Sequence, residues 1–120
     1  MSLLAMALIG LIAALHIYIL WFEMFAWETK GPKIFRSFPR DLFAPTRMLA
    51  ANQGLYNGFL AAGLIWSLII SDPLWAGRIA SFFLLCVAVA GAYGAATAAR
   101  RILYVQTVPA VLALAAVWLL

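Results

Sequence analysis

The sequence predicts an all-α fold, a polytopic membrane protein in which four transmembrane helices form a bundle. Hydrophobic residues make up 68% of the chain and charged residues only 10%, which is not the composition of a soluble domain. The apolar residues are grouped in four long runs, and the Lys and Arg residues lie in or beside the breaks between them. We therefore expect a single transmembrane domain over residues 1–120, with spans at about 3–27, 48–70, 74–98 and 102–120.

The first span, at about residues 3–27, is long enough to cross a hydrocarbon core of about 30 Å. A secretory signal peptide is the competing interpretation. However, the run lacks a basic beginning and ends in aromatic and acidic residues instead of a small-residue cleavage site. On a helix, His16 and Glu23 share one stripe, so the two ionisable side chains of this span point in the same direction.

The connection at residues 28–47 is the only long polar segment of the chain. Its basic residues alternate with apolar ones, which is typical of a segment that rests on the membrane interface with its charges near anionic headgroups. The apolar residues expected to face the membrane are Ile34, Phe35, Phe38, Leu42 and Phe43. Because Pro32, Pro39 and Pro45 exclude one continuous helix, we expect two short pieces or an irregular loop.

The second span, at about residues 48–70, begins with an unusually polar stretch from Asn52 to Asn57. Polar side chains in a membrane helix are costly unless they find partners. At about 100° per residue, we place the amides on one face and Gly54 and Gly58 on the opposite one. The Gly-x-x-x-Gly spacing lets two helix backbones approach closely, so one face is expected to be functional and the other to pack.

A Ser-Asp-Pro turn at residues 71–73 closes the second span and predicts an N-cap for the third. The third span, at about 74–98, repeats the same division of faces. Gly91 and Ala95 lie on its small-residue stripe, and Tyr93 lies on its more polar one. We therefore expect this helix, too, to pack through its small residues.

The fourth span, at about residues 102–120, follows a short basic turn at Arg100 and Arg101 and carries Tyr104 near its beginning. Pro109 lies farther along the same run. Because proline has no backbone N–H to donate to the carbonyl four residues earlier, we expect a kink in the helix before Pro109.

Lys and Arg residues are divided unevenly between the two sides of the expected bundle. The first and third connections hold seven of them, at positions 30, 33, 36, 40, 47, 100 and 101, whereas the other side has only Arg78. By the positive-inside rule, these two connections face the cytoplasm. Both chain ends are therefore expected outside the cytoplasm.

This orientation places most polar side chains of the spans in the cytoplasmic half of the bundle, where we expect a cavity with His16 at its floor. The expected ligand-binding residues are Glu23, Asn52, Gln53, Tyr56, Asn57, His16, Tyr93 and Tyr104. The expected helix-packing residues are Gly54, Gly58, Ala62, Gly91 and Ala95. One His, one Cys and one deep carboxylate are too few ligands for a zinc site, so no metal and no cofactor is expected.

Glu23 has two interpretations. In a ligand cavity its carboxyl group would be hydrogen-bonded to neutral side chains and would accept a proton or a cationic group. The neutral partners expected for it are Asn52, Tyr56 and Tyr93. Alternatively, Glu23 forms an ion pair with Arg47 or Arg100 and serves only to hold the helices in register.

Two motifs carry a resemblance to a known family. The first is His16 followed by Glu23-Met24-Phe25-Ala26-Trp27, and the second is the stretch from Asn52 to Gly63, Asn-Gln-Gly-Leu-Tyr-Asn-Gly-Phe-Leu-Ala-Ala-Gly. With both motifs, the whole chain resembles domain of unknown function family 1304. The resemblance implies a small bacterial inner-membrane protein with four helices, and it implies nothing about a substrate.

Three functions fit the sequence. The first is binding or transport of a small, partly apolar molecule in the cytoplasmic-side cavity. The second is a membrane-embedded enzyme acting on a lipid or isoprenoid, with Glu23 and His16 as acid and base, so enzymatic activity stays open. The third is an assembly subunit without its own ligand. The expected partners are membrane lipids, a hydrophobic or amphiphilic small ligand and further copies of the chain, but not nucleic acid.

Overall fold

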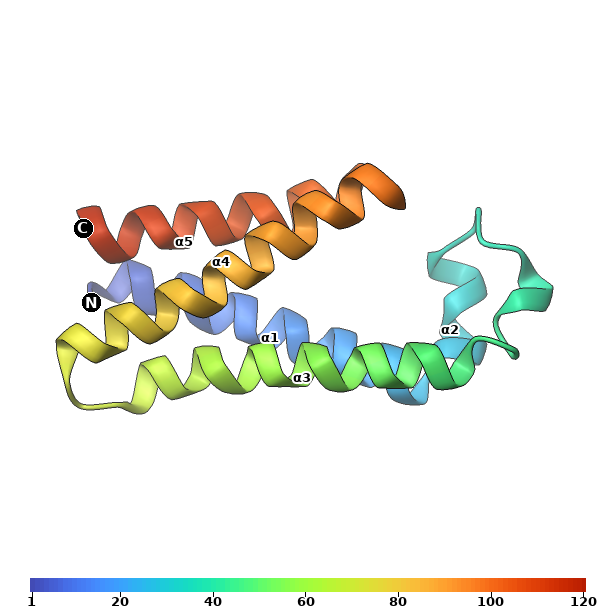
Figure 1. Ribbon diagram of the computed structural model, residues 1–120, viewed down its shortest axis with the longest axis horizontal. Coiled ribbons are helices and arrows are strands. Elements are labelled where there is room, and N and C mark those ends of the chain that lie inside the picture. The colour runs from blue at the N-terminus through green and yellow to red at the C-terminus, as the bar shows by residue number, and fades with distance from the viewer. The chain divides into compact units, whose positions relative to one another are not determined.

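The computed structural model describes residues 1–120 and is entirely helical (Figure 1). The α-helices are α1 (Leu3–Phe25), α2 (Trp27–Ile34), α3 (Arg47–Ile69), α4 (Pro73–Thr97) and α5 (Val108–Leu119). A 3₁₀ helix covers Arg40–Leu42, and a π-helical turn covers Leu103–Thr107 immediately before α5. The all-α prediction is therefore confirmed, and each predicted span coincides with a long helix or with the π-helical turn and α5 together.

Two of the helices have the length and composition of membrane spans. They are α1, with a mean hydropathy of 2.5, and α4, with a mean hydropathy of 2.0. The segment Leu103–Leu119 is apolar but shorter. Helix α3 has 23 residues, but the amides in its first turns lower its hydropathy. By length and composition, two helices could therefore cross a membrane, whereas the four-span bundle stays a prediction.

The chain divides into two compact units. One unit consists of residues 1–14 and 60–120, and the other consists of residues 15–59. The single transmembrane domain expected over the whole chain stays a prediction, because this division does not test it.

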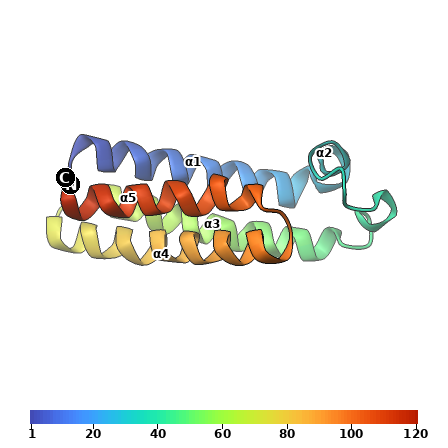
Figure 2. The same cartoon turned by 90° about the horizontal axis from the view of Figure 1, so that it is seen from above.

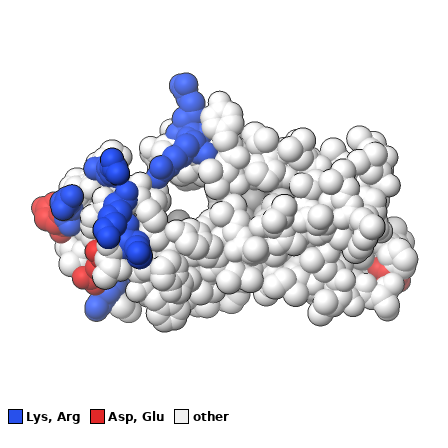
Figure 3. Space-filling view, turned by 180° about the vertical axis from the view of Figure 1, so that it is seen from behind, with Lys and Arg blue, Asp and Glu red and all other residues white.

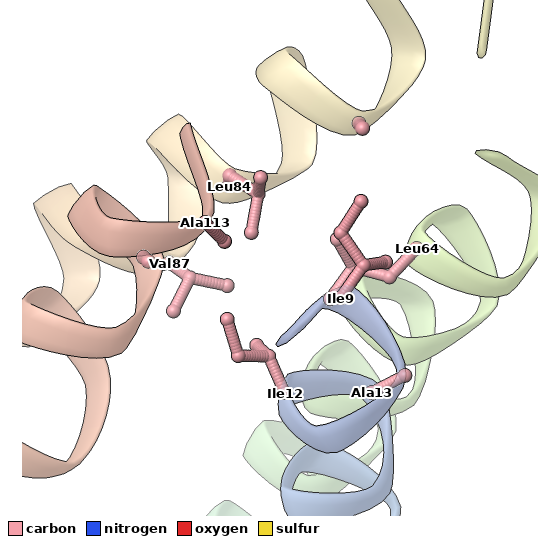
Figure 4. Close-up of a cluster of buried hydrophobic side chains, with 9 residues drawn as sticks. Ile9, Ile12, Ala13, Leu64, Leu84, Val87 and Ala113 are labelled. Atoms are coloured by element: carbon pink, nitrogen blue, oxygen red, sulfur yellow. The ribbon is translucent and has the colours of Figure 1, made fainter. Parts of the chain in front are cut away.

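The core of the unit formed by residues 1–14 and 60–120 receives side chains from four helices (Figure 4). Helix α1 contributes Ile9 and Ile12, α3 contributes Leu64, and α4 contributes Leu84 and Val87. Helix α5 contributes only alanines to the buried set, which lets its backbone pack closely without a large side chain between the helices. The N- and C-termini lie at the same end of this unit (Figures 1 and 2).

The predicted N-cap at residues 71–73 is confirmed. The Asp72 carboxylate accepts hydrogen bonds from the backbone N–H groups of Leu74 and Trp75, at 2.9 and 3.3 Å, and Pro73 follows as the first residue of α4. These bonds satisfy donors that the helix itself leaves unpaired, so a sharp turn joins α3 to α4.

The expected kink before Pro109 appears as the π-helical turn Leu103–Thr107. Because Pro109 cannot donate to the Val105 carbonyl, the regular spacing of hydrogen bonds is lost at this point, and a wider turn replaces it. The hydroxyl of Thr107 donates to the Ala88 carbonyl of α4 at 2.9 Å. The turn is thus attached to α4 by a side-chain hydrogen bond.

In the unit formed by residues 15–59, aromatic rings gather around Trp27 at the start of α2. The ring centroids of Phe22, Phe35, Phe38 and Phe43 lie 5.0 to 6.0 Å from that of Trp27. Aromatic pairs at such distances favour tilted and edge-to-face packing, and the ring planes here are inclined by 54° to 87°. We call these five rings the aromatic cluster.

The aromatic cluster corrects one prediction. Phe35, Phe38 and Phe43 were expected to face the membrane, but their rings pack on Trp27, and Phe43 is only 2% exposed. Leu42, in contrast, is 40% exposed and free to lie at an interface. Of the two forms expected for this connection, two short pieces or an irregular loop, the structure has the first, in α2 and the 3₁₀ helix (Figure 2).

Two further contacts hold this connection together. The indole N–H of Trp27 donates to the hydroxyl of Thr46 at 3.0 Å, and that hydroxyl donates to the Leu42 carbonyl at 2.7 Å. Gly31 lies directly beneath the Phe43 ring, in a space that a Cβ atom would share with the ring. The segment from Trp27 to Thr46 is therefore a packed structure and not a free linker.

Candidate polar site on helices α1 and α3

The central interaction of the candidate site joins Glu23 of α1 to Asn57 of α3. The side-chain N–H₂ group of Asn57 donates one hydrogen bond to Glu23 Oε1 at 2.7 Å and another to the Gln53 carbonyl at 3.1 Å. Glu23 is half-buried. A short bond from an amide to a carboxylate in a half-buried position is stronger than one between neutral groups. It therefore fixes the orientation of the Glu23 carboxylate.

Close packing of α3 on α1 brings the two side chains together. A Cβ atom at Gly54 would lie 2.8 Å from Met24 Cγ, 3.0 Å from Glu23 Cβ and 3.2 Å from the Leu20 carbonyl oxygen. A Cβ atom at Gly58 would meet only the flexible end of the Leu20 side chain. Gly54 is thus the position where α3 approaches the α1 backbone, and it does so at the level of Glu23.

This packing corrects the predicted division of the α3 faces. Asn57 does not lie opposite the glycines, because it follows Gly54 by three residues and precedes Gly58 by one, which places it on their side of the helix. Asn52, Gln53 and Tyr56 are exposed, and Tyr56 retains 57% of its accessible surface. The predicted hydrogen-bond partners Asn52 and Tyr56 are therefore wrong, and the observed partner of Glu23 is Asn57.

One of the two arginines expected to form an ion pair with Glu23 has another partner. Arg47 pairs instead with Glu28, with 3.6 Å between Nε and Oε1, and both side chains are largely exposed. The hydrogen-bond partner of the Glu23 carboxylate is an amide, which orients it but does not supply a positive charge.

His16 is fully buried, in contrast to the half-buried Glu23. No buried side-chain nitrogen or oxygen of residues 1–120 lacks a hydrogen-bond partner, so the imidazole is satisfied within the fold. A satisfied, fully buried imidazole has no free face for a substrate. The burial of His16 therefore favours a packing role over that of an acid or base.

The remaining predicted residues lie in the unit formed by residues 1–14 and 60–120. Tyr93 and Tyr104 are 71% and 63% exposed, Ala62 is exposed and Ala95 is half-buried. Gly91 is buried, and a Cβ atom there would collide with Thr107. Whether Tyr93 and Tyr104 belong to one cavity with Glu23 stays a prediction.

An apolar hollow on α4 was not expected from the sequence. It has a volume of about 640 Å³. It is lined by Phe82, Leu85, Cys86, Val89, Ala90 and Tyr93. All these residues come from one exposed face of one helix, at a spacing of three or four residues. The helical spacing of these apolar residues is visible in the sequence. An apolar stripe that faces lipid has the same spacing, so the spacing alone does not predict a hollow.

Comparison with known proteins identifies the family. The model of the family described as "Protein of unknown function (DUF1304)" matches residues 10–118. The chain belongs to this family. The match includes Glu23, Gly54 and Asn57, so the resemblance carried by the two motifs is confirmed. The DUF1304 chain is also 30% identical, over 116 residues, to the protein named "Uncharacterized protein YpaA" of Lactococcus lactis.

The similarity to the Lactococcus lactis protein extends over 95% of this chain and 96% of that relative. The two proteins are therefore alike over nearly their full lengths and not through a shared fragment. No solved structure matches the chain. The family and its relative thus establish kinship, and the function has to be argued from the site itself.

Proposed function

We propose that this DUF1304 member is a multi-pass protein of the inner membrane that binds or transports a small, partly apolar cation beside Glu23. The observation that carries the proposal is the hydrogen bond of 2.7 Å between the Asn57 amide and the Glu23 carboxylate, within the apolar helix α1. An amide orients this carboxylate and leaves its charge uncompensated by a cationic side chain of the same unit.

A carboxylate in a membrane helix is expensive, and such residues are generally paired or functional. If Glu23 served only to hold α1 and α3 together, a cationic side chain would compensate its charge best. Arg47, one of the two cationic partners expected for Glu23, is engaged with Glu28 instead. The arrangement therefore suits a carboxylate whose cationic partner, a proton or a ligand, arrives from outside the chain.

The surroundings of Glu23 fit a ligand that is partly apolar. Gln53, one turn before Asn57, and Tyr56, directly before it, are both exposed on α3. Large apolar side chains such as Tyr18 and Phe59 are also about half exposed in the same unit. A small number of polar groups within an apolar wall is the usual composition of a small-molecule site.

The proposal is tested by titrating the purified protein, in a neutral detergent, with the lipophilic cation tetraphenylphosphonium. Glu23→Gln keeps the shape of the side chain and an oxygen for Asn57, but it removes the charge. We expect the affinity to fall at least about tenfold, since an ion pair with a half-buried carboxylate contributes more than about 1.4 kcal/mol. The matched control is Glu28→Gln, which removes an exposed carboxylate. Equal binding by both variants, or none by the wild type, would contradict the proposal.

The proposed topology has its own test. A reporter fused after Leu120 is expected to be active outside the cytoplasm, and one inserted near Pro39 is expected to be active inside. The termini of the unit formed by residues 1–14 and 60–120 lie at the same end, as an even number of spans requires (Figures 1 and 2). Activity of the Pro39 fusion on the outside would reverse the orientation and, with it, the side from which a ligand reaches Glu23.

A further inference from the structure

A second polar feature lies outside the proposed site, in the connection between α1 and α3. It is a hollow of about 340 Å³ lined by Pro32, Lys33, Arg36 and Arg40. Lys and Arg side chains gather over α2 and the segment that follows it (Figure 3). Three of the four lining residues are cationic, and none is acidic. We call this hollow the basic hollow.

The fold builds the basic hollow from two helical pieces. Lys33 belongs to the last turn of α2, and Arg40 is the first residue of the 3₁₀ helix. Arg36 follows Phe35, whose backbone N–H closes the end of α2 by donating to the Gly31 carbonyl at 2.8 Å. The three cations are therefore attached to hydrogen-bonded backbone, not to a free chain.

The aromatic cluster determines which way the cations point. Phe35 and Phe38 alternate with Arg36 and Arg40 along the chain. Their rings pack on Trp27. Because the aromatic side chains occupy the inner side of the connection, the basic side chains are left on its outer side, where all three are exposed. The packing of the aromatic rings on Trp27 therefore leaves the three basic side chains together on the outer side of the connection.

Three like charges around one small hollow repel each other unless an anion lies between them. Two carboxylates are near these cations along the chain: Asp41, which directly follows Arg40, and Glu28, which is paired with Arg47. Neither lines the hollow, and Asp41 forms no ion pair with the three cations. Two guanidinium groups offer planar pairs of N–H donors that match the oxygens of a phosphate, and the lysine ammonium adds a point charge. The basic hollow is thus suited to a tetrahedral oxyanion.

We propose that the basic hollow binds a phosphate group through Lys33, Arg36 and Arg40. The shared chemistry is a phosphate oxyanion, carried either by the headgroup of an anionic lipid or by a free phosphate. The lipid is the better fit, because α2 begins two residues after the end of the apolar helix α1 and therefore lies near the membrane surface. Basic clusters next to a span attract anionic lipids in this way.

The test measures which lipids remain on the protein. Protein in nanodiscs with equal amounts of phosphatidylglycerol and phosphatidylcholine is released and analysed by native mass spectrometry. Arg36→Gln/Arg40→Gln is expected to lower the retained ratio of phosphatidylglycerol to phosphatidylcholine about 25-fold, since each cation contributes roughly a factor of five. The matched control is Lys30→Gln/Arg100→Gln, which removes the same charge from outside the hollow and should change the ratio less than about threefold.

A second arm separates the two sources of phosphate. In a neutral detergent, the protein is titrated with inorganic phosphate and with short-chain phosphatidylglycerol, followed by phosphorus NMR. Binding of the lipid alone identifies a headgroup site, and binding of both ligands identifies a site for the free anion as well. In either case the Arg36→Gln/Arg40→Gln variant must lose the binding. If the two double variants behave alike, or if the wild type retains neither ligand, the basic hollow is not a phosphate site.

Discussion

Gly91→Leu is expected to destabilise the protein by at least about 3 kcal/mol, at the upper end of what overpacking usually costs. A Cβ atom at Gly91 would collide with the Thr107 hydroxyl and lie 2.8 Å from the Thr107 backbone nitrogen and 2.9 Å from Gln106 Cβ. Because one of these atoms belongs to the backbone of the π-helical turn, a side-chain rotation cannot relieve the contact. The turn itself would have to move away from α4, and the hydrogen bond from Thr107 to the Ala88 carbonyl would be lost.

Gly10→Leu is the matched control for this substitution. It introduces the same side chain into another helix, at a glycine with no atom within 4 Å of its added Cβ. Thermal unfolding of both variants in the same detergent gives the comparison. The control is expected to melt close to the wild type, and Gly91→Leu is expected to melt at least about 5 °C lower or to fail to accumulate. Equal melting temperatures for the two variants would show that α4 does not pack tightly on the π-helical turn.

Much of the fold follows from the sequence because apolar periodicity and turn residues are local signals. The second span was expected at 48–70 and is observed at Arg47–Ile69, and the third was expected at 74–98 and is observed at Pro73–Thr97. Asp72 and Pro73 define that boundary through their own backbone chemistry, which requires no distant partner. The first helix ends at Phe25, two residues earlier than expected.

The form of the break before Pro109 was less predictable. Proline removes one hydrogen bond, and a helix can respond with a kink, a wider turn or an interruption. The π-helical turn is favoured here by partners on another helix, where Thr107 binds the Ala88 carbonyl and Gly91 leaves room for it. Those partners are more than fifteen residues away in the sequence, so local reasoning could not choose among the three forms.

The candidate site shows the same limit. Glu23 was singled out from the sequence because a carboxylate in an apolar run is rare, and its expected partners were cavity-lining amides and phenols or, alternatively, an arginine. The partner is Asn57, which lies on the packed side of α3 beside Gly54. Helix α3 cannot be divided into a polar face and a small-residue face, because Asn57 lies between Gly54 and Gly58. The contact between the helices decides which residue meets the carboxylate.

The aromatic cluster was missed for a related reason. Alternating basic and aromatic residues are expected both in a segment lying on lipid and in one that folds its rings over a tryptophan. A tryptophan near the end of a span, such as Trp27, is ordinarily an interface anchor whose indole faces the headgroups. In the structure its N–H group donates to Thr46, and four phenylalanine rings surround it. Only the tertiary contacts distinguish the two arrangements.

Trp27→Ala is therefore expected to disorder the connection between α1 and α3, at a cost of about 3 kcal/mol, the lower end for removing a large aromatic side chain because Trp27 is half-buried. The substitution removes the ring on which Phe22, Phe35, Phe38 and Phe43 pack. It also removes the hydrogen bond to Thr46. Hydrogen exchange measured by mass spectrometry should show faster exchange at residues 27–46, with little change in the core of residues 60–120.

Two variants make the result specific. Trp27→Phe keeps an aromatic ring but cannot donate to Thr46, so it should cost only about 1 kcal/mol. Trp21→Ala removes an indole of the same unit that is 44% exposed and lies outside the aromatic cluster, and it should leave exchange at residues 27–46 unchanged. If Trp27→Ala exchanged no faster than Trp21→Ala, the aromatic cluster would not hold the connection in place. In that case the basic side chains it carries would have no fixed arrangement from which to bind a phosphate.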